Sequence, residues 1–166
     1  MAKIKFPLAV RNKNPLNIRH SKGDLWQGLV SAKSGFCVFS SFVYGYRAAF
    51  RLLHTYNTKY HLVTIRDIIK RWAPESENNT IGYIKRVCEL IGCVDTFIID
   101  VDNIEDREYA ISLVQAMASV ESGVPYDRIA RETIAAAWEV AFMGASEKVF
   151  TAHGFYRSDE ERRNKC

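Results

Sequence analysis

Apolar residues recur at three- and four-residue steps in several stretches of the chain, the spacing that places them on one face of a helix. The clearest case is the set Ala110, Leu113, Val114, Met117 and Val120. It predicts a helix over residues 106–121 that stops at Ser122-Gly123, with Pro125 just beyond. The same spacing predicts further helices over residues 42–56, 65–72, 80–91 and 127–143.

Two short segments near the N-terminus have a different pattern. Residues 26–30 and 35–40 predict two strands joined by a turn at 31–34, a small hairpin. Residues 1–10 are expected to form a short arm or edge strand, and residues 95–105 an irregular or strand-like link. The predicted fold class is an α-rich α+β domain with about five or six helices and one hairpin.

Polar residues mark where these helices begin and end. Thr64 and Asp67 have the spacing of a capping box, and Ala73-Pro74 ends the helix that they open. Asn78 or Asn79 is placed to cap the next helix, which stops at Gly92.

The length of 166 residues suits one domain, here expected over residues 1–156, with a charged tail at 157–166. The net charge is +4. This mild excess fits a weakly anionic partner such as cell wall, nucleic acid or a lipid headgroup, and selects none of them. No apolar run is long enough to cross a membrane.

The sequence suggests neither a metal nor a cofactor. The four cysteines form no C-x-x-C pair and no zinc spacing, so we expect reduced thiols in a protein made in the cytosol. Residues 95–105 are rich in acids but lack the glycine of a calcium-binding loop. We find no signal peptide. A site of action outside the cytosol would require delivery by another component.

Glu121 is the main candidate for chemistry. It lies on or beside the apolar face of its helix and at the helix C-terminus, where the macrodipole disfavours a negative charge. Partial burial disfavours the charge as well, so both effects raise the pKa of Glu121, as a general acid requires. The alternative is a carboxylate that extends into water and has no catalytic role.

A second candidate region is the loop of residues 11–19, which contains Asn12, Asn14 and Asn17 between two arginines. Asparagine side chains can hold the backbone of a tight loop or hydrogen-bond the carbonyls and hydroxyls of a ligand. The pattern alone leaves both interpretations open.

Four motifs together resemble the lysozyme-like peptidoglycan hydrolases, especially the bacterial and phage branch of N-acetylglucosaminidases and lytic transglycosylases. They are N-P-L-N-I-R at 14–19, F-C-V-F-S at 36–40, W-A-P-E-S-E-N-N-T-I-G-Y at 72–83 and V-E-S-G at 120–123. In that family the glutamate helix precedes the asparagine loop, whereas here it comes after the loop. This order is what a circular permutation gives. The chain is also similar to a group of phage virion-associated and lysis-like proteins.

The resemblance implies a lysozyme-like fold that cleaves β-1,4 bonds of the peptidoglycan glycan strand, with Glu121 as general acid. Glu77 would be the second carboxylate, with Glu75 behind it. Substrate-binding roles would fall to aromatic residues that stack on sugars and to polar residues that bind acetamido or lactyl groups: Trp26, Tyr83 and Tyr126, and Asn14, Asn17 and Arg19. The protein would act at the cell wall or in the periplasm, carried by a phage particle or released through another protein.

The chemistry implies a geometry, because a glutamate cleaves a sugar bond only if a groove presents that bond within hydrogen-bond reach. We expect the end of the 106–121 helix to face the hairpin of residues 26–39, with residues 14–19 alongside and the turn of residues 77–83 as the other wall. Trp26 and Tyr83 should then lie near the Glu121 carboxylate.

Two other functions remain open at this stage. One is a non-catalytic virion or wall-binding protein of the same fold. The other is a nucleic-acid binder, because residues 64–72 and 79–91 have the outline of a helix-turn-helix. The turn between them is long and carries two glutamates, which makes nucleic acid the less favoured partner.

Overall fold

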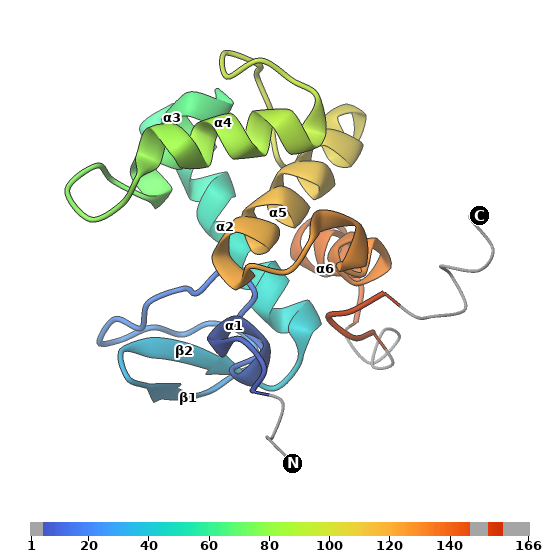
Figure 1. The fold of residues 1–166 in the computed structure, drawn as a ribbon. Helices are drawn as coiled ribbons and strands as arrows, with labels where there is room; N and C mark the ends of the chain where they lie inside the picture. The colour runs from blue at the N-terminus through green and yellow to red at the C-terminus, as the bar shows by residue number, and fades with distance from the viewer. Residues whose placement is uncertain (1–4, 147–152, 158–166) are drawn as a thin grey trace.

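The computed structural model describes residues 5–146 and 153–157, and its ribbon shows a helical body beside a small sheet (Figure 1). The helices are α1 (Leu8–Arg11), α2 (Phe42–Tyr60), α3 (Ile65–Trp72), α4 (Thr80–Ile91), α5 (Arg107–Ser122) and α6 (Arg131–Phe142), with 3-10 turns at Ile104–Asp106 and Tyr126–Arg128. The strands β1 (Leu29–Lys33) and β2 (Phe36–Phe39) pair antiparallel. The predicted α+β class is confirmed.

One prediction near the N-terminus was wrong. The expected arm or edge strand contains a short helix, α1, which begins after Pro7. Proline favours the start of a helix because it has no N–H that would be left unpaired there. Pro7 was therefore a local sign of a helix, and the prediction of an arm did not use it. The remaining N-terminal residues 1–4, and residues 158–166 of the expected tail, lie outside the described part of the chain.

Helix α2 packs both against the loop of residues 12–19, which we call the early loop, and against other helices. It begins at Ser41, whose hydroxyl accepts the Tyr44 N–H at 3.2 Å, and it packs along α6. At Gly45 a Cβ atom would collide with the carbonyl of Lys13. The absence of a side chain there lets the loop after α1 lie directly against α2.

Helices α3 and α4 start as their capping residues predict. The Thr64 side chain accepts the Asp67 N–H, and the Asn79 side chain accepts the Gly82 N–H. The hydroxyl of buried Thr80 donates to the carbonyl of Ala73, which fastens the turn between the two helices. The two helices pack against each other, and α4 packs against α5.

Helix α5 is the core helix of the molecule and carries Glu121 near its end. Its side chains from Ala110 to Ser119 are buried with the exception of Ser112, because α4, α6, α2 and α1 all contact it. It ends at Gly123, whose φ of 72° is the left-handed conformation of a helix C-cap. The end of this late helix lies beside α1 and the loop after it (Figure 1).

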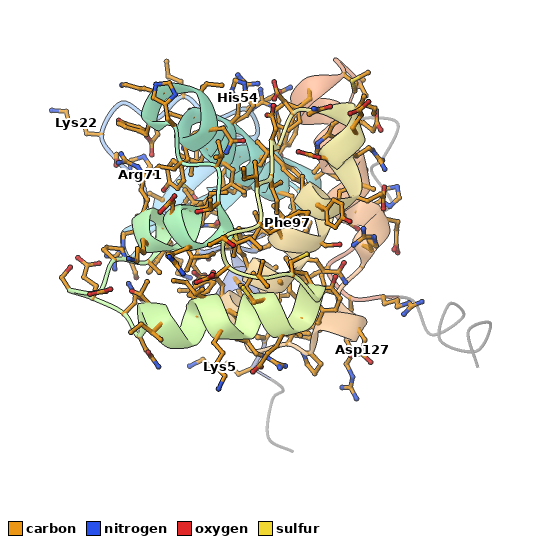
Figure 2. All side chains as sticks on the ribbon, turned by 90° about the horizontal axis from the view of Figure 1, so that it is seen from above. Lys5, Lys22, His54, Arg71, Phe97 and Asp127 are labelled. Carbon is orange, nitrogen blue, oxygen red and sulfur yellow. The ribbon has the colours of Figure 1, made fainter. Side chains whose placement is uncertain are left out.

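Seen from above, the side chains of the helices fill the middle of the molecule, while Lys5, Lys22 and Asp127 project at its edges (Figure 2). Within the described residues, no helix is both long enough and apolar enough to span a bilayer. Nor does this part of the chain bring three or more His, Cys, Asp or Glu side chains together in a way that could hold a metal ion.

Candidate active site

The Glu121 carboxylate is half-buried and accepts hydrogen bonds from three separate elements. The Trp72 indole Nε1–H at the end of α3 donates to Oε1 at 3.1 Å, and the Tyr83 hydroxyl on α4 donates to the same oxygen at 3.2 Å. The Asn17 amide donates to Oε2 at 3.2 Å and to the Glu121 backbone carbonyl at 3.2 Å. Glu121 is therefore fixed in place by donors from three parts of the sequence.

The loop that presents Asn17 is held from inside by Asn14. The Asn14 amide donates to the carbonyls of Ile18 and Cys37 at 2.9 and 3.0 Å, and its oxygen accepts the Ile18 N–H at 2.9 Å. Asn14 is fully buried, so the expectation that it binds substrate was wrong. Asn17 itself has a φ of 51°, a left-handed conformation that asparagine tolerates better than most residues.

Burial raises the pKa of Glu121 above its ordinary value, and the hydrogen bonds from Asn17, Trp72 and Tyr83 oppose that shift. All three donors are neutral, so none of them supplies a positive charge that would hold the carboxylate in its ionised form. Burial also raises the pKa of Tyr83 well above its ordinary range, so its hydroxyl keeps its proton. A carboxyl group in this environment holds its proton more tightly than an exposed glutamic acid does.

A cavity of about 340 Å³ opens beside the carboxylate, and we call this cavity the cleft. Its lining includes Arg19 of the early loop, Phe36 of β2, Trp72 of α3, and Glu77 and Asn78 of the turn before α4. The remaining lining residues are Leu16, Asn17, Ile18, Leu52, Tyr56, Ala73 and Glu121. Arg19 and Glu77, both exposed, form an ion pair of 3.7 Å between the early loop and the turn before α4.

The structure brings together five of the residues that the sequence singled out. Asn17, Arg19, Glu77 and Glu121 line the cleft, and Tyr83 reaches it through its bond to Glu121. Tyr83 is buried, with 8% of its surface exposed, so it does not offer a ring face to a sugar as the resemblance implied. Its role is to bind the carboxylate.

Trp26 and Tyr126 are not among the residues that line the cleft, so the structure does not bring them together with Glu121 as the resemblance implied. Trp26 packs partly buried against the core before β1. Tyr126 lines a different hollow, with Gln115 and Arg131, and its carbonyl accepts the Gln115 side chain at 3.0 Å. Both residues follow turns, and the spacing of nearby residues does not show where a segment lies in the fold after such a turn.

Sequence reasoning left Trp72 open between a core residue and a ligand-facing one, and it did not connect Trp72 with Glu121. The helical period of α3 places Trp72 on the same face as Ile65, Ile68 and Ile69, which indicates a core residue. One signal was available: a buried tryptophan needs an acceptor for its indole N–H. In this fold the acceptor is Glu121.

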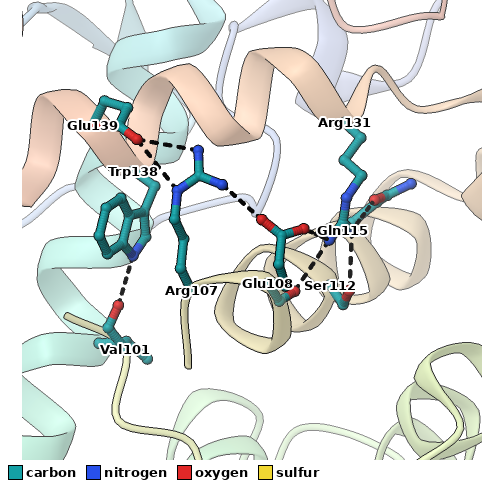
Figure 3. A network of polar contacts seen from close by, with 8 residues as sticks. All are labelled: Val101, Arg107, Glu108, Ser112, Gln115, Arg131, Trp138 and Glu139. Atoms are coloured by element: carbon teal, nitrogen blue, oxygen red, sulfur yellow. Dashed lines mark hydrogen bonds and ion pairs between the residues drawn. The ribbon is translucent and has the colours of Figure 1, made fainter. Parts of the chain in front are cut away.

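The opposite end of α5 carries a second polar network (Figure 3). Arg107 bridges Glu108 at 2.6 Å and Glu139 at 3.1 Å, and Arg131 bonds Glu108 at 2.9 Å and also Ser112 and Gln115. Every acid in this network faces an arginine. It fastens α6 to α5 and lies away from the cleft, since none of its members lines the cleft.

Comparison with known proteins finds a phage protein that is similar to this chain. No family model matches the chain. Over 127 residues the chain is 37% identical to Protein P5 of Pseudoalteromonas phage PM2; the match spans 72% of this chain and 76% of that protein.

Proposed function

We propose that this chain, which belongs to the family of Protein P5 of Pseudoalteromonas phage PM2, cleaves β-1,4-glycosidic bonds in the glycan strand of peptidoglycan. The observation that carries the proposal is the half-buried Glu121, held by three neutral donors at the side of a cleft. Such a carboxyl group has the raised pKa and the fixed position that a general acid needs.

In the proposed reaction, protonated Glu121 gives its proton to the bridging oxygen as the bond from that oxygen to C1 breaks. Positive charge develops on the sugar ring that keeps C1. The leaving sugar departs with a free hydroxyl, and Glu121 remains as a carboxylate that its three donors stabilise.

The second half of the reaction needs a nucleophile at C1. Glu77 is the other carboxylate in the cleft lining, so it is the proposed group to activate water or to stabilise the sugar cation. An alternative is attack by the substrate's own hydroxyl or acetamido group, in which case Glu121 suffices. The product identifies which of the two occurs.

The proposed fold is a circularly permuted lysozyme-like domain. Its support is the order of the parts around Glu121: the asparagine loop, the hairpin, the turn before α4 and, last, the glutamate helix. Membership in a phage protein family supports the further proposal that the protein is carried by a phage particle or acts in host lysis.

The test is digestion of purified sacculi with subsequent mass spectrometry of the released material. The wild-type protein should release muropeptides that end either in a reducing sugar, which indicates hydrolysis, or in a 1,6-anhydro sugar, which indicates intramolecular attack. Glu121→Gln should release neither. Wild-type protein that binds sacculi and releases no fragment would replace the enzyme with the non-catalytic wall-binding protein of the same fold.

A further inference from the structure

Two cations gather on one exposed tyrosine at the end of α2. The Arg71 guanidinium carbon lies 3.7 Å from the centre of the Tyr60 ring, and the Lys59 ammonium lies 5.4 Å from the same centre. Tyr60 is 40% exposed, and both cations are exposed as well. We call Lys59, Tyr60 and Arg71 the basic cluster.

The basic cluster has no counter-charge of its own. Neither Lys59 nor Arg71 takes part in any ion pair within residues 5–146 and 153–157. Stacking uses a face of the guanidinium, and the guanidinium also hydrogen-bonds the Tyr56 hydroxyl, so its other in-plane N–H groups can still donate to a ligand. Two cations held near one ring repel each other, and an anion that binds between them relieves that repulsion.

An aromatic wall connects the basic cluster to the cleft. Arg71 also lies over the ring of Tyr56, 5.2 Å from its centre, and Tyr56 lines the cleft. The Tyr56 and Trp72 rings meet edge to face at 6.4 Å, and Trp72 bonds Glu121. Figure 2 shows Arg71 at the edge of the molecule.

We propose that the basic cluster is a carboxylate-binding subsite that holds the stem peptide of the glycan strand while the glycosidic bond lies at Glu121. The inference rests on the proposed function. Guanidinium groups bind carboxylates through paired N–H donors, and the stem peptides of peptidoglycan carry carboxylates at intervals along an otherwise neutral glycan. The subsite therefore distinguishes peptidoglycan from neutral polymers of N-acetylglucosamine.

The experiment measures binding by tryptophan fluorescence, because Trp72 lies between the basic cluster and Glu121. All variants carry Glu121→Gln to prevent turnover. The probes are an N-acetylmuramoyl peptide with free carboxylates, the same compound with its carboxylates amidated, and the neutral trisaccharide of N-acetylglucosamine. The matched control for Arg71→Gln is Lys70→Gln, which removes the same charge from the same helix but lies at a different hollow.

Arg71→Gln should weaken binding of the free-carboxylate peptide by about threefold to tenfold, the scale of a charge-assisted contact at an exposed site. Binding of the amidated peptide and of the trisaccharide should change by less than about twofold, and Lys70→Gln should leave all three unchanged. Equal weakening for the amidated and free peptides would show that Arg71 only supports the aromatic wall, and would overturn the subsite.

The two proposals fail in different ways. If the free peptide binds no better than its amidated form to the Arg71-containing protein, the subsite is wrong while cleavage of sacculi stands. If sacculi are not cleaved but the charge-dependent binding is present, the enzyme proposal is wrong and the carboxylate subsite belongs to a wall-binding protein.

Discussion

Helix α5 carries two glutamates that face opposite environments. Glu108, in its first turn, meets the guanidinium groups of Arg131 and Arg107, and these contacts lower the pKa of Glu108. Glu121, in its last turn, meets only neutral donors in a half-buried site, and burial raises the pKa of Glu121. The helix macrodipole shifts the two pKa values in the same directions, because it favours a negative charge at Glu108 in the first turn and disfavours one at Glu121 in the last turn.

The difference separates a structural acid from a candidate catalytic one. Glu108 is held as an anion, so it contributes to the attachment of α6 and has no proton to give near neutral pH (Figure 3). Glu121 is also held by several hydrogen bonds, but its donors are neutral and carry no positive charge that would keep it ionised. Hydrogen bonds without a counter-charge allow the proton to come and go while the side chain stays in place.

The largest effect is expected for Glu121→Gln. It removes the proton donor and retains the shape, so turnover on sacculi should fall by about two to four orders of magnitude. Glu108→Gln is the matched control on the same helix and should keep wild-type turnover. Near wild-type activity in Glu121→Gln would take this residue out of the mechanism.

Glu121 should also make stability depend on pH. Because its pKa in the folded protein lies above the ordinary value of 4.5, the folded state binds the proton more tightly than the unfolded state does. The resulting contribution to stability is fully present below pH 4.5 and is lost as pH rises through the folded pKa. Urea denaturation across this range should show that loss in wild type, and Glu121→Gln should lack it.

Next in size are the variants of the two donors to Oε1. Trp72→Phe and Tyr83→Phe each remove a hydrogen bond that opposes the raised pKa of Glu121, so the basic limb of the pH–rate profile should move to higher pH. Turnover at the optimum should fall by about tenfold, because the carboxyl group is less firmly oriented. Tyr109→Phe, an exposed position on α5, serves as the control. A lower rate with an unmoved limb would mean that the two side chains act only on packing.

Arg131→Gln tests the other end of α5. Loss of its bonds to Glu108, Ser112 and Gln115 should lower the free energy of unfolding by about 1 kcal/mol, a figure that allows for the exposure of the site. Activity per folded molecule should not change. Since the pKa of Glu108 is lowered in the folded protein, this stability is present above about pH 4.5 and is lost at lower pH. Denaturation at pH 7 and pH 3 checks both statements, with exposed Arg128→Gln as the comparison.

The smallest effect is expected at the edge of the cleft. Glu77→Gln should lower turnover by less than Glu121→Gln does if Glu77 acts on the nucleophile. Arg19→Gln breaks the same ion pair but leaves that carboxylate in place, so it should have the smaller effect. Equal turnover in the two variants would reduce Glu77 to a partner of Arg19.

The sequence by itself determined where most of the helices lie. Thr64, Asn79 and Gly123 cap the helices they were expected to cap, because a cap depends on a few neighbouring residues and their hydrogen bonds. The apolar spacing of residues 110–120 likewise predicted a helix packed in the core, and it placed Glu121 near the end of that helix.

Only the tertiary structure decided which groups surround Glu121. Asn17 lies 104 positions away from it in the sequence, Trp72 49 and Tyr83 38. Spacing within a segment says which face a side chain occupies, but not which distant segment that face meets. Trp26 and Trp72 could therefore each be a core residue or a ligand contact until the packing of α3, α4 and the early loop around the end of α5 was known.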